Sequence, residues 1–498
     1  MGDGRIKSGV GSVNIDTTLG EIAFITTGKL DANAQDDNGK YPFFTCGEEN
    51  LSINTVAFDT EAVLLAGNGN FSVKYYNGKF NAYQRTYVIS PNHIDGKWLY
   101  YLVAHHIAKI TTGARGSTIK YLRIGDISEC AVKLVPLEHQ KRIVAKIEEL
   151  FSELDNGIAA LKTAREQLKV YRQAILKHAF EGKLTAKWRE ENPDKLETPE
   201  QLLHRIQQKR DVRYQQQLEE WKTTSNKGKK PSKPKSPIQL SILNSDLPHG
   251  WFMVSLDWLL TTEKKPMTTG PFGTALKKSE HQPCGVPVLG IENIGKGKFI
   301  HGNKIFVDET KAKELLPFKI HPGEIVISRS GTVGEICEVP GDVTNALIST
   351  NLLRVSLDSS VILSPFFVLM FQGGEVKLQV KGLCKGSSRE FLNQSILSSI
   401  RYPICGLEEQ KVLLERLETK FSIIEQQEKE IDELLNKSEI LRQSILKIAF
   451  SGHLVPQASH DESASELLER IKAEKEQQKQ PANKSAIKRS RKKVSSEA

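Results

Sequence analysis

The chain has 498 residues, more than one hydrophobic core usually organises, so two or more folded domains are expected. Hydrophobic residues make up 39% and charged residues 26%, a balance that excludes a disordered chain, and no apolar run approaches the roughly 20 residues that span a bilayer. The formal net charge of +9 raises the question of a polyanionic partner.

The first variable block, defined here as residues 1–135, is expected to mix α and β structure. Short strand-like runs such as 62–65 and 86–89 alternate with the turn signals Asn77-Gly78 and Asp95-Gly96. The N-terminus lacks the apolar core of a secretion signal, and six scattered cysteines form no C-x-x-C pair. These features predict a cytoplasmic protein without a disulfide framework or a thiolate zinc site.

Residues 74–85 interleave cations, aromatic rings and amides, which can grip phosphate oxygens and contact base edges. The candidate DNA-binding residues in this stretch are Lys74, Tyr76, Lys79, Tyr83, Gln84 and Arg85. The alternative is a tyrosine-rich strand pair that packs on a core and exposes a cationic face to solvent.

An internal repeat relates residues 137–184 to residues 407–454 at a constant offset of 270. Sixteen of the 48 aligned positions are identical, too many for chance, so the chain consists of two half-units. Each half-unit is a variable block followed by a similar helical block. The repeat continues downstream, where Leu202-Leu203-x-Arg205-Ile206 matches Leu467-Leu468-x-Arg470-Ile471.

Both repeated segments show a heptad pattern over about 43 residues, which predicts a long helix of roughly 65 Å. The first seam runs from Ile143 to Ile175 and includes Tyr171; the second runs from Leu413 to Ile445 and includes Leu434 and Leu441. Glycines 182 and 452 lie where C-terminal helix caps are expected. The two seams either pair with each other within the chain or form a homodimeric coiled coil.

Two segments that are not expected to belong to a folded domain account for the excess of basic residues. Residues 222–245 contain six lysines, three prolines and no acid, which is typical of an extended basic linker. The polar C-terminal tail contains the basic run 488–493 and is expected to be disordered. These flexible segments could add salt-sensitive, sequence-independent attraction to DNA.

The second variable block, defined here as residues 246–405, is also expected to mix α and β structure, with strands at 286–289, 324–328 and 352–355. Its weaker DNA-binding candidates are Lys277, Lys278, Arg329 and Thr332.

A glycine- and serine-rich loop with cations recurs in both blocks, just before Tyr121-Leu122 and Phe391-Leu392. The candidates in these loops are Arg115, Ser117, Lys120, Lys385, Ser387 and Arg389. Such a loop either clamps a phosphate with its backbone amides or is a structural turn before a helix.

No convincing catalytic motif is present. Residues 290–296 match the start of a phosphate-binding loop, but Gly297 replaces the required Ser or Thr, so a turn between strands is expected. The pair His105-His106 has no accompanying carboxylate or thiolate cluster and is expected to pack half-buried. The chain is therefore predicted to bind rather than to catalyse.

Residues 171–189, YRQAILKHAFEGKLTAKWR, resemble the central conserved region of Type I restriction-modification specificity subunits. The Pro136-Leu-Glu-x-Gln-Lys entry, Asp246-Leu-Pro-x-Gly-Trp251 and the run that begins at Val286 also look like patterns of this family. The first block departs from the pattern because it lacks the Leu-Pro-x-Gly-Trp entry, and the lysine-rich linker and tail are further departures.

The resemblance implies an α+β protein with a pseudo-twofold internal repeat, in which two long helices pair as an antiparallel coiled coil between two mixed α/β target recognition domains. The implied domains are a first target recognition domain (1–135), a central conserved helical region (136–221), a basic linker (222–245), a second target recognition domain (246–405), a C-terminal conserved helical region (406–475) and a disordered tail (476–498).

The implied function is recognition of an asymmetric, bipartite site in double-stranded DNA. Two modification (methyltransferase) subunits would dock on the conserved helices, and restriction (translocase/nuclease) subunits would complete the complex. The residues implied for docking are Arg172, Gln173, Phe180, Arg442, Gln443 and Phe450. The chain itself would bind no cofactor, because S-adenosylmethionine, ATP and Mg²⁺ would belong to the partners.

Two other functions remain open on the sequence alone. One is the specificity subunit of a Type II bipartite methylase-nuclease, and the other is a coiled-coil scaffold that does not bind DNA.

Overall fold

The computed structural model describes residues 14–223, 230–233, 247–262, 265–272, 275–384, 390–458 and 460–477. The chain folds into two compact units, the first containing residues 1–162 and 431–498 and the second residues 163–430. Each unit contains one variable block and one part of each long helix. The expected α+β class, with two mixed α/β blocks and a pair of long helices, is confirmed. Most of the basic linker and of the tail lies outside the described residues.

A six-stranded sheet of order β2-β7-β5-β6-β3-β4 forms the centre of the first block, and only the β3–β6 pair is parallel. Its strands are β2 (Ala23–Thr27), β3 (Tyr41–Phe44), β4 (Leu51–Ile53), β5 (Phe58–Ala66), β6 (Val73–Ala82) and β7 (Thr86–Pro91). The block also contains an antiparallel pair, β1 (Ile15–Thr18) and β8 (Ala131–Leu134), and the helices α1 (Leu19–Ile22), α2 (Gly96–Thr111) and α3 (Ile124–Ser128). The strands predicted at 62–65 and 86–89 lie in β5 and β7.

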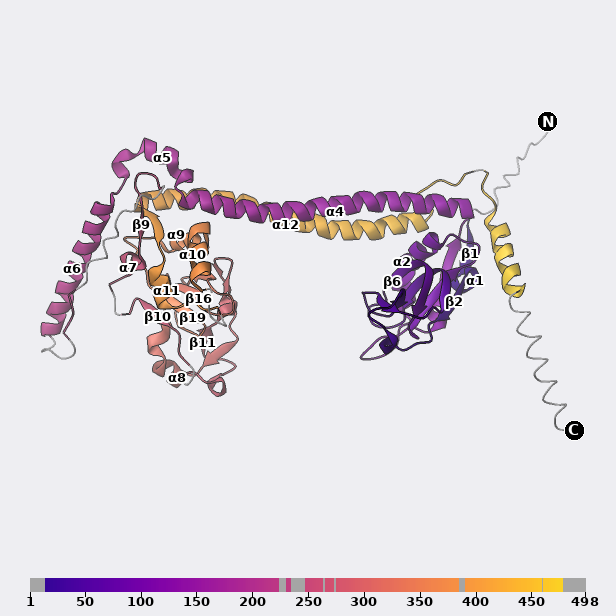
Figure 1. Ribbon diagram of the computed structural model, residues 1–498, viewed down its shortest axis with the longest axis horizontal. Helices are drawn as coiled ribbons and strands as arrows, with labels where there is room; N and C mark the ends of the chain where they lie inside the picture. Colours follow the sequence, from indigo (N-terminus) through magenta and orange to yellow (C-terminus); the bar gives the residue numbers. More distant parts are fainter. Residues whose placement is uncertain are drawn as a thin grey trace, which may run out of the picture. The chain divides into compact units, whose positions relative to one another are not determined.

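Strand β5 is buried on both faces, which explains its unbroken apolar run. Ala62 and Leu64 pack on one side in a cluster with Phe80, whereas Val63 and Leu65 pack on the other side in a cluster that includes Trp98 of α2. Figure 1 shows α2 between this sheet and the long helices. The sheet is therefore attached to the helices through α2.

The two predicted turns of the first block have different outcomes. Asp95 is the N-cap of α2 and accepts a hydrogen bond from the Trp98 N–H at 2.8 Å, so this signal marks the start of a helix. The turn predicted at Asn77-Gly78 is wrong, because both residues pair with β5 inside β6. Gly78 takes a φ of 133° there, a backbone conformation that side-chain-bearing residues rarely adopt, so the glycine serves an irregular strand.

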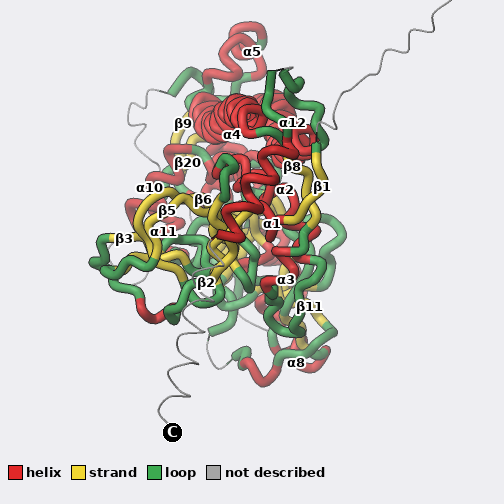
Figure 2. Tube along the Cα trace, turned by 90° about the vertical axis from the view of Figure 1, so that its right-hand side faces the viewer, coloured by secondary structure: helices red, strands yellow, loops and turns green. Residues whose placement is uncertain are grey.

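The repeated segments form helices α4 (Leu137–Phe180) and α12 (Leu407–Phe450), each of 44 residues. The first part of α4 shares a unit with the last part of α12, and the last part of α4 shares a unit with the first part of α12. The two helices therefore pair within the chain and run antiparallel. Figures 1 and 2 draw them side by side.

The predicted heptad seam is buried at Ile143, Ile147 and Ile175, with Leu413, Leu417, Ile424, Ile431 and Ile445 on the second helix. The prediction is wrong at three seam positions: Tyr171, Leu434 and Leu441 are 52%, 46% and 50% exposed. Two helices alone cover only a narrow stripe of each other, and these side chains lie at its margin.

Both helices end at the predicted glycine caps. Gly182 and Gly452 adopt φ angles of 69° and 84°, and their N–H groups donate to the carbonyl oxygens of Ala179 and Ala449. Positive φ costs glycine little, which is why the repeat retains it at both sites.

A buried glutamine fixes each block to the start of its long helix. The Gln140 side-chain amide donates to the Val135 carbonyl at 2.8 Å, and its oxygen accepts the Asp95 N–H at 2.9 Å. Gln410 is bound in the same way by Cys405 and Leu363, at the same two distances. The Leu-Glu-x-Gln-Lys motif is therefore a structural junction that is used twice.

The second block contains two four-stranded sheets, of order β10-β19-β16-β17 and β14-β11-β18-β15, and the pairs β12-β13 and β20-β9. Its strands are β9 (Trp251–Val254), β10 (Met267–Thr269), β11 (Val286–Leu289), β12 (Ile294–Gly295), β13 (Lys298–Phe299), β14 (Ile305–Val307), β15 (Lys319–Ile320), β16 (Ile325–Ser328), β17 (Ile336–Glu338), β18 (Ala346–Ile348), β19 (Leu352–Val355) and β20 (Tyr402–Cys405). Its helices are α7 (Leu256–Leu259), α8 (Glu309–Glu314), α9 (Ser364–Gln372), α10 (Gly374–Cys384) and α11 (Gln394–Ser399).

A helix that follows each long helix packs back onto the same unit. After α5 (Ala186–Glu191), α6 (Pro199–Thr223) buries Leu202 and Ile206 in the core of the second unit. The helical residues 464–477 bury Leu467 and Ile471 in the core of the first unit. The downstream part of the sequence repeat therefore has the same packing role in both units.

Candidate nucleic-acid interface

Three loops of the first block meet where β5 ends and β7 begins. The Gly67 N–H donates to the Arg85 carbonyl at 2.8 Å, and the Leu122 N–H donates to the Gly67 carbonyl at 2.8 Å. Arg115 and Tyr121 exchange two backbone hydrogen bonds of 3.0 and 2.8 Å. The glycine loop at 113–122 is thereby joined to the turn at 83–85.

A hollow of about 260 Å³ lies at this meeting point, lined by Gly67, Gln84, Arg85, Tyr87, Tyr121 and Leu122. Gln84 and Arg85, which line the hollow, are exposed, and the glycine loop that contributes Tyr121 and Leu122 also exposes Arg115, Ser117 and Lys120. The Arg115 guanidinium lies 3.3 Å from the Asp126 carboxylate. Exposed cations and an amide around a hollow are suited to phosphate oxygens and base edges.

The candidates on β6 are held by the block itself. The Tyr76 ring packs 5.3 Å from Phe44 and 5.8 Å from Phe80, between ring centroids. The Lys74 ammonium donates to the Gly47 carbonyl and the Asn50 side chain, both at 2.9 Å, and burial lowers its pKa.

Of two further candidates, Lys79 also lies on β6 and Tyr83 directly follows that strand. Lys79 is exposed and lies 4.0 Å from the Asp59 carboxylate. Tyr83 is half-buried, and its backbone N–H donates to the Phe44 carbonyl at 2.9 Å. The structure thus separates the β6 candidates from the turn candidates, which line the hollow.

The second block brings a comparable set of groups to the end of β16. The Arg329 guanidinium lies over the rings of Phe272 and Phe391, 5.2 and 6.0 Å from their centroids. Both rings are exposed, at 62% and 40%. The Ser330 hydroxyl donates to the Asn351 side-chain oxygen at 2.7 Å.

Of the remaining candidates of this block, Thr332 also lies at the end of β16, whereas the two lysines lie near β11 and β14. Thr332 is exposed, and its hydroxyl donates to Ser328 at 3.2 Å. Lys277 and Lys278 are exposed next to Leu276, which packs with the β11 and β14 core. Lys385, Ser387 and Arg389 lie outside the described residues.

Four of the six residues implied for partner docking make contacts within the chain. The Arg172 guanidinium lies 4.2 Å from the Phe421 ring centroid, and the Arg442 guanidinium lies 4.6 Å from that of Phe151 and pairs with Asp155. Phe180 is buried against Phe366, and Phe450 stacks on His105, both at 5.3 Å. Gln173 and Gln443 are exposed.

Sequence reasoning missed two exposed apolar pairs beside these residues. Val170 and Ile440 are 71% and 69% exposed, and each precedes the half-exposed Tyr171 or Leu441. The two pairs are related by the repeat offset of 270. The repeat places both pairs at equivalent positions, but the heptad pattern predicts Tyr171 and Leu441 to lie in the buried seam.

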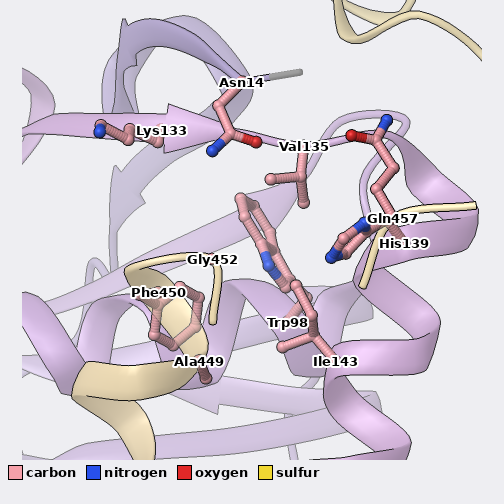
Figure 3. A pocket seen from close by; sticks show the side chains of 10 residues that line it. All are labelled: Asn14, Trp98, Lys133, Val135, His139, Ile143, Ala449, Phe450, Gly452 and Gln457. Carbon is pink, nitrogen blue, oxygen red and sulfur yellow. The ribbon is translucent and has the colours of Figure 1, made fainter. Parts of the chain in front are cut away.

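A small, partly open cavity of about 140 Å³ lies where the first block joins the helices (Figure 3). Trp98 Nε1, His139 Nδ1 and Gln457 Oε1 line it, buried and without a hydrogen-bond partner. Polar atoms of this kind in a small cavity usually bind ordered water. Pockets for small-molecule ligands typically have about 300–1,000 Å³, so this cavity is small for a cofactor.

Two enzyme-like sequence signals have structural roles. Ile294–Gly295 and Lys298–Phe299 pair as a hairpin, so the predicted turn between strands at the apparent phosphate-binding loop is confirmed. His105 stacks on Phe450, and His106 Nδ1 lies 3.0 Å from the Leu102 carbonyl oxygen. Among the described residues no group of three or more His, Cys, Asp or Glu side chains is placed to hold a metal ion. Within the same residues, none of the helices combines the length and apolarity that a bilayer crossing requires.

Comparisons with known proteins agree on one family. The family model of the Type I restriction modification DNA specificity domain matches residues 16–163. The Type I restriction enzyme EcoDI specificity subunit of Escherichia coli is 34% identical over 472 residues, covering 92% of this chain and 94% of that protein. The EcoBI specificity subunit of Escherichia coli is 23% identical over 395 residues, covering 78% and 73%.

A solved structure shows the same fold. It concerns complex assembly and conformational transition of the type I R-M system, and its matching chain is 15% identical with a TM-score of 0.58. The match covers 89% of this chain and 99% of that chain.

Proposed function

Because the chain belongs to the family of Type I restriction enzyme specificity subunits, we propose that it recognises an asymmetric DNA site made of two half-sites. Each variable block reads one half-site. The observation that carries this proposal is the duplicated architecture, in which two blocks with different exposed side chains are attached to one helix pair by the same glutamine junction. Two different surfaces are what two different half-sites require.

The chain acts as the non-catalytic recognition subunit. The modification subunits bring S-adenosylmethionine and methylate adenine, and the restriction subunits use ATP and Mg²⁺. The sequence motifs support this division, because neither block contains a recognisable catalytic constellation.

Two modification subunits dock at the repeated apolar pairs on the helices. Val170-Tyr171 and Ile440-Leu441 occupy equivalent repeat positions, and each pair precedes an arginine and an exposed glutamine. Equivalent patches are suited to two copies of one partner, and exposed apolar side chains on a helix favour a protein partner.

The docking proposal is tested by charge insertion. Tyr171→Glu should release one modification subunit and Leu441→Glu the other, so each variant should form a complex with a single modification subunit, as measured by native mass spectrometry. Lys437→Glu, an exposed change on α12 outside both pairs, is the control. Retention of both subunits by both test variants would refute the docking sites.

Mapping of methylated adenines in host DNA tests the recognition function. Host DNA should carry methylated adenine in an asymmetric two-part sequence only when the chain and its modification subunits are present. Replacing residues 14–135 by another block should change one half-site alone; a change in both would refute modular reading. A scaffold would give no site, and isolation of the natural partners separates a Type I from a Type II system.

The helix pair sets the distance between the half-sites. Helices of 44 residues at about 1.5 Å per residue are roughly 66 Å long, enough to separate two readers by the ~34–36 Å of one DNA turn. Deleting seven residues from both helices should shorten the spacer while leaving the half-site sequences intact. An unchanged spacer would contradict this role.

A further inference from the structure

The two blocks share a backbone framework that their sequences conceal. In the first block, Ala66 of β5 pairs with Thr86 of β7, and Thr27 of β2 pairs with Tyr87. In the second block, Ser328 of β16 pairs with Leu352 of β19, and Thr269 of β10 pairs with Leu353. The strand trios β2-β7-β5 and β10-β19-β16 thus have the same order, direction and register.

Hydrogen bonds outside the strands extend the correspondence. The Gly67 N–H donates to the Arg85 carbonyl at 2.8 Å, and the Arg329 N–H donates to the Asn351 carbonyl at 2.9 Å. The Leu122 N–H then donates to the Gly67 carbonyl, as the Leu392 N–H donates to the Arg329 carbonyl. Gly67 therefore corresponds to Arg329, and Arg85 corresponds to Asn351.

A glycine next to each trio confirms the alignment. The Gly28 N–H donates to the Thr86 carbonyl at 3.2 Å, and the Gly270 N–H donates to the Leu352 carbonyl at 3.0 Å. A Cβ atom on either glycine would lie 1.9 Å from a backbone carbonyl oxygen, that of Ala82 or Ser349. Only glycine fits this close approach, so Gly28 and Gly270 occupy corresponding positions beside the two trios.

Side chains on this common framework differ between the blocks. The position before the second strand carries Arg85 in one block and Asn351 in the other, and both are exposed. The strand that follows this position and the hydrogen bond accepted by its carbonyl oxygen fix its backbone. A side chain that projects from a fixed backbone is suited to base recognition, because little conformational freedom is lost on binding.

We propose that Arg85 and Asn351 occupy the same base-reading position, one in each half-site. This inference rests on the proposed recognition of a two-part DNA site. Arginine forms a bidentate contact with O6 and N7 of guanine, and asparagine with N6 and N7 of adenine. In the second block, the Ser330 hydroxyl donates to the Asn351 oxygen and orients the amide, so its NH₂ group points away from Ser330.

Each framework also carries an exposed or partly exposed aromatic ring. Tyr121 lines the hollow that contains Arg85, and its sequence counterpart Phe391 lies beneath the Arg329 guanidinium. These rings offer apolar contact to a neighbouring thymine methyl group, and Arg329 adds a cation that is preoriented by two ring faces.

The test maps methylated adenines with the complete complex that contains Arg85→Ala, Asn351→Ala or one of two controls. Arg85→Ala should reduce methylation of the natural site about 10- to 100-fold and relax one guanine position in one half-site. Asn351→Ala should relax one adenine position in the other half-site. Lys133→Ala and Lys313→Ala remove exposed lysines from β8 and from α8 and should leave both half-sites unchanged.

Exchange variants keep the test decisive if an alanine variant is poorly folded. Arg85→Asn should change the preferred base at its position from guanine to adenine. Asn351→Arg should change the preferred base at its position in the other half-site from adenine to guanine. Uniform weakening at all sites together with a shallower salt dependence would assign the side chains to phosphates and overturn the inference. Intact half-sites in all four variants would also overturn it, whereas a wild-type complex without a two-part site would instead refute the proposed function.

Discussion

The two variable blocks have the same framework but different bodies. In the first block the ten-residue strand β6 pairs antiparallel with β5 and then parallel with β3, which makes one continuous sheet. In the second block two short strands divide this role, since β17 pairs with β16 and β18 pairs with β11, and two separate sheets result. The strands that hold the candidate interface are retained, while the segments that connect them are free to vary. A recognition module can therefore change its loops without losing the frame that positions them.

The junctions between block and helix also differ, despite the repeat. In the second unit, Glu409 accepts hydrogen bonds from Arg189, Trp251 and Thr185 at 2.5–2.6 Å and is 2% exposed. His139 takes the equivalent repeat position in the first unit. There, Arg142 donates to Asp461 at 2.9 Å and is 34% exposed, so the charge pair is only partly withdrawn from water.

The largest expected effect follows from this difference. Glu409→Ala leaves the largely buried Arg189 charge without a carboxylate partner and should lower the stability of the second unit by about 3–5 kcal/mol. Asp461→Ala leaves an arginine that water can reach and should cost the first unit only about 1–2 kcal/mol. Hydrogen exchange resolved by unit measures both losses. Equal losses would show that the two junctions are energetically alike.

The glutamine junctions should be nearly equivalent. Gln140→Ala strands a buried backbone donor and acceptor and should destabilise the first unit by about 1–3 kcal/mol. Gln410 also donates to the Val361 carbonyl at 3.0 Å, so Gln410→Ala should cost the second unit slightly more. Urea unfolding with hydrogen-exchange detection gives the two values. A loss confined to one of the two variants would break the proposed equivalence.

The two arginine–phenylalanine contacts should contribute less. Arg172→Ala should cost about 0.5–1 kcal/mol, the usual value of an exposed cation–π contact. Arg442→Ala should cost slightly more, because this arginine also pairs with Asp155. Lysine at either position keeps the charge, so recovery of stability in the lysine variant would show that charge rather than shape carries the contact.

Acidification should lower the stability of the first unit more than that of the second, without any mutation. Burial lowers the pKa of His105, His106 and His139, all in the first unit. His106 and Lys447 lower the pKa of His105 further, as Lys109 does for His106 and Arg142 for His139, whereas the hydrogen bond with the Leu102 carbonyl raises the pKa of His106. Asp461 raises the pKa of His139. The unfolded chain therefore binds these protons more readily, and the first unit should lose stability as the pH falls below about 6.5.

This loss should be absent at pH 7.5 and measurable at pH 5.5 by hydrogen exchange corrected for intrinsic rates. His139→Gln should reduce it. A first unit whose stability is independent of pH over this range would contradict the role of the buried histidines.

The local and repeated features were predictable from the sequence, because each rests on spacing within one segment. The offset of 270 revealed the helices and the glycines revealed their caps. The order of the strands in the sheets could not be predicted, because most strands have six residues or fewer and carry little pattern, and their partners often lie far along the chain. Tyr76 illustrates the difficulty at the candidate site: aromatic residues between cations suit both DNA binding and a core, and the ring packs on Phe44.

The hydrogen-bonded framework was equally hidden. The short Thr-Thr-Gly runs at 26–28 and 268–270 and the loops before Leu122 and Leu392 recur in both blocks, but such brief segments do not align the strands between them. Backbone hydrogen bonds place few demands on side-chain identity, so the correspondence of Arg85 with Asn351 required coordinates.

The crossed contacts of the helices have one more consequence. Arg172 of one repeat meets Phe421 of the other, and Arg442 meets Phe151, so each repeat supplies one arginine and one ring to the same kind of contact. Each repeat is in this sense self-complementary, because it carries both the arginine and the ring that this contact requires. Each repeat thus supplies both complementary groups, as each member of a self-complementary pair does.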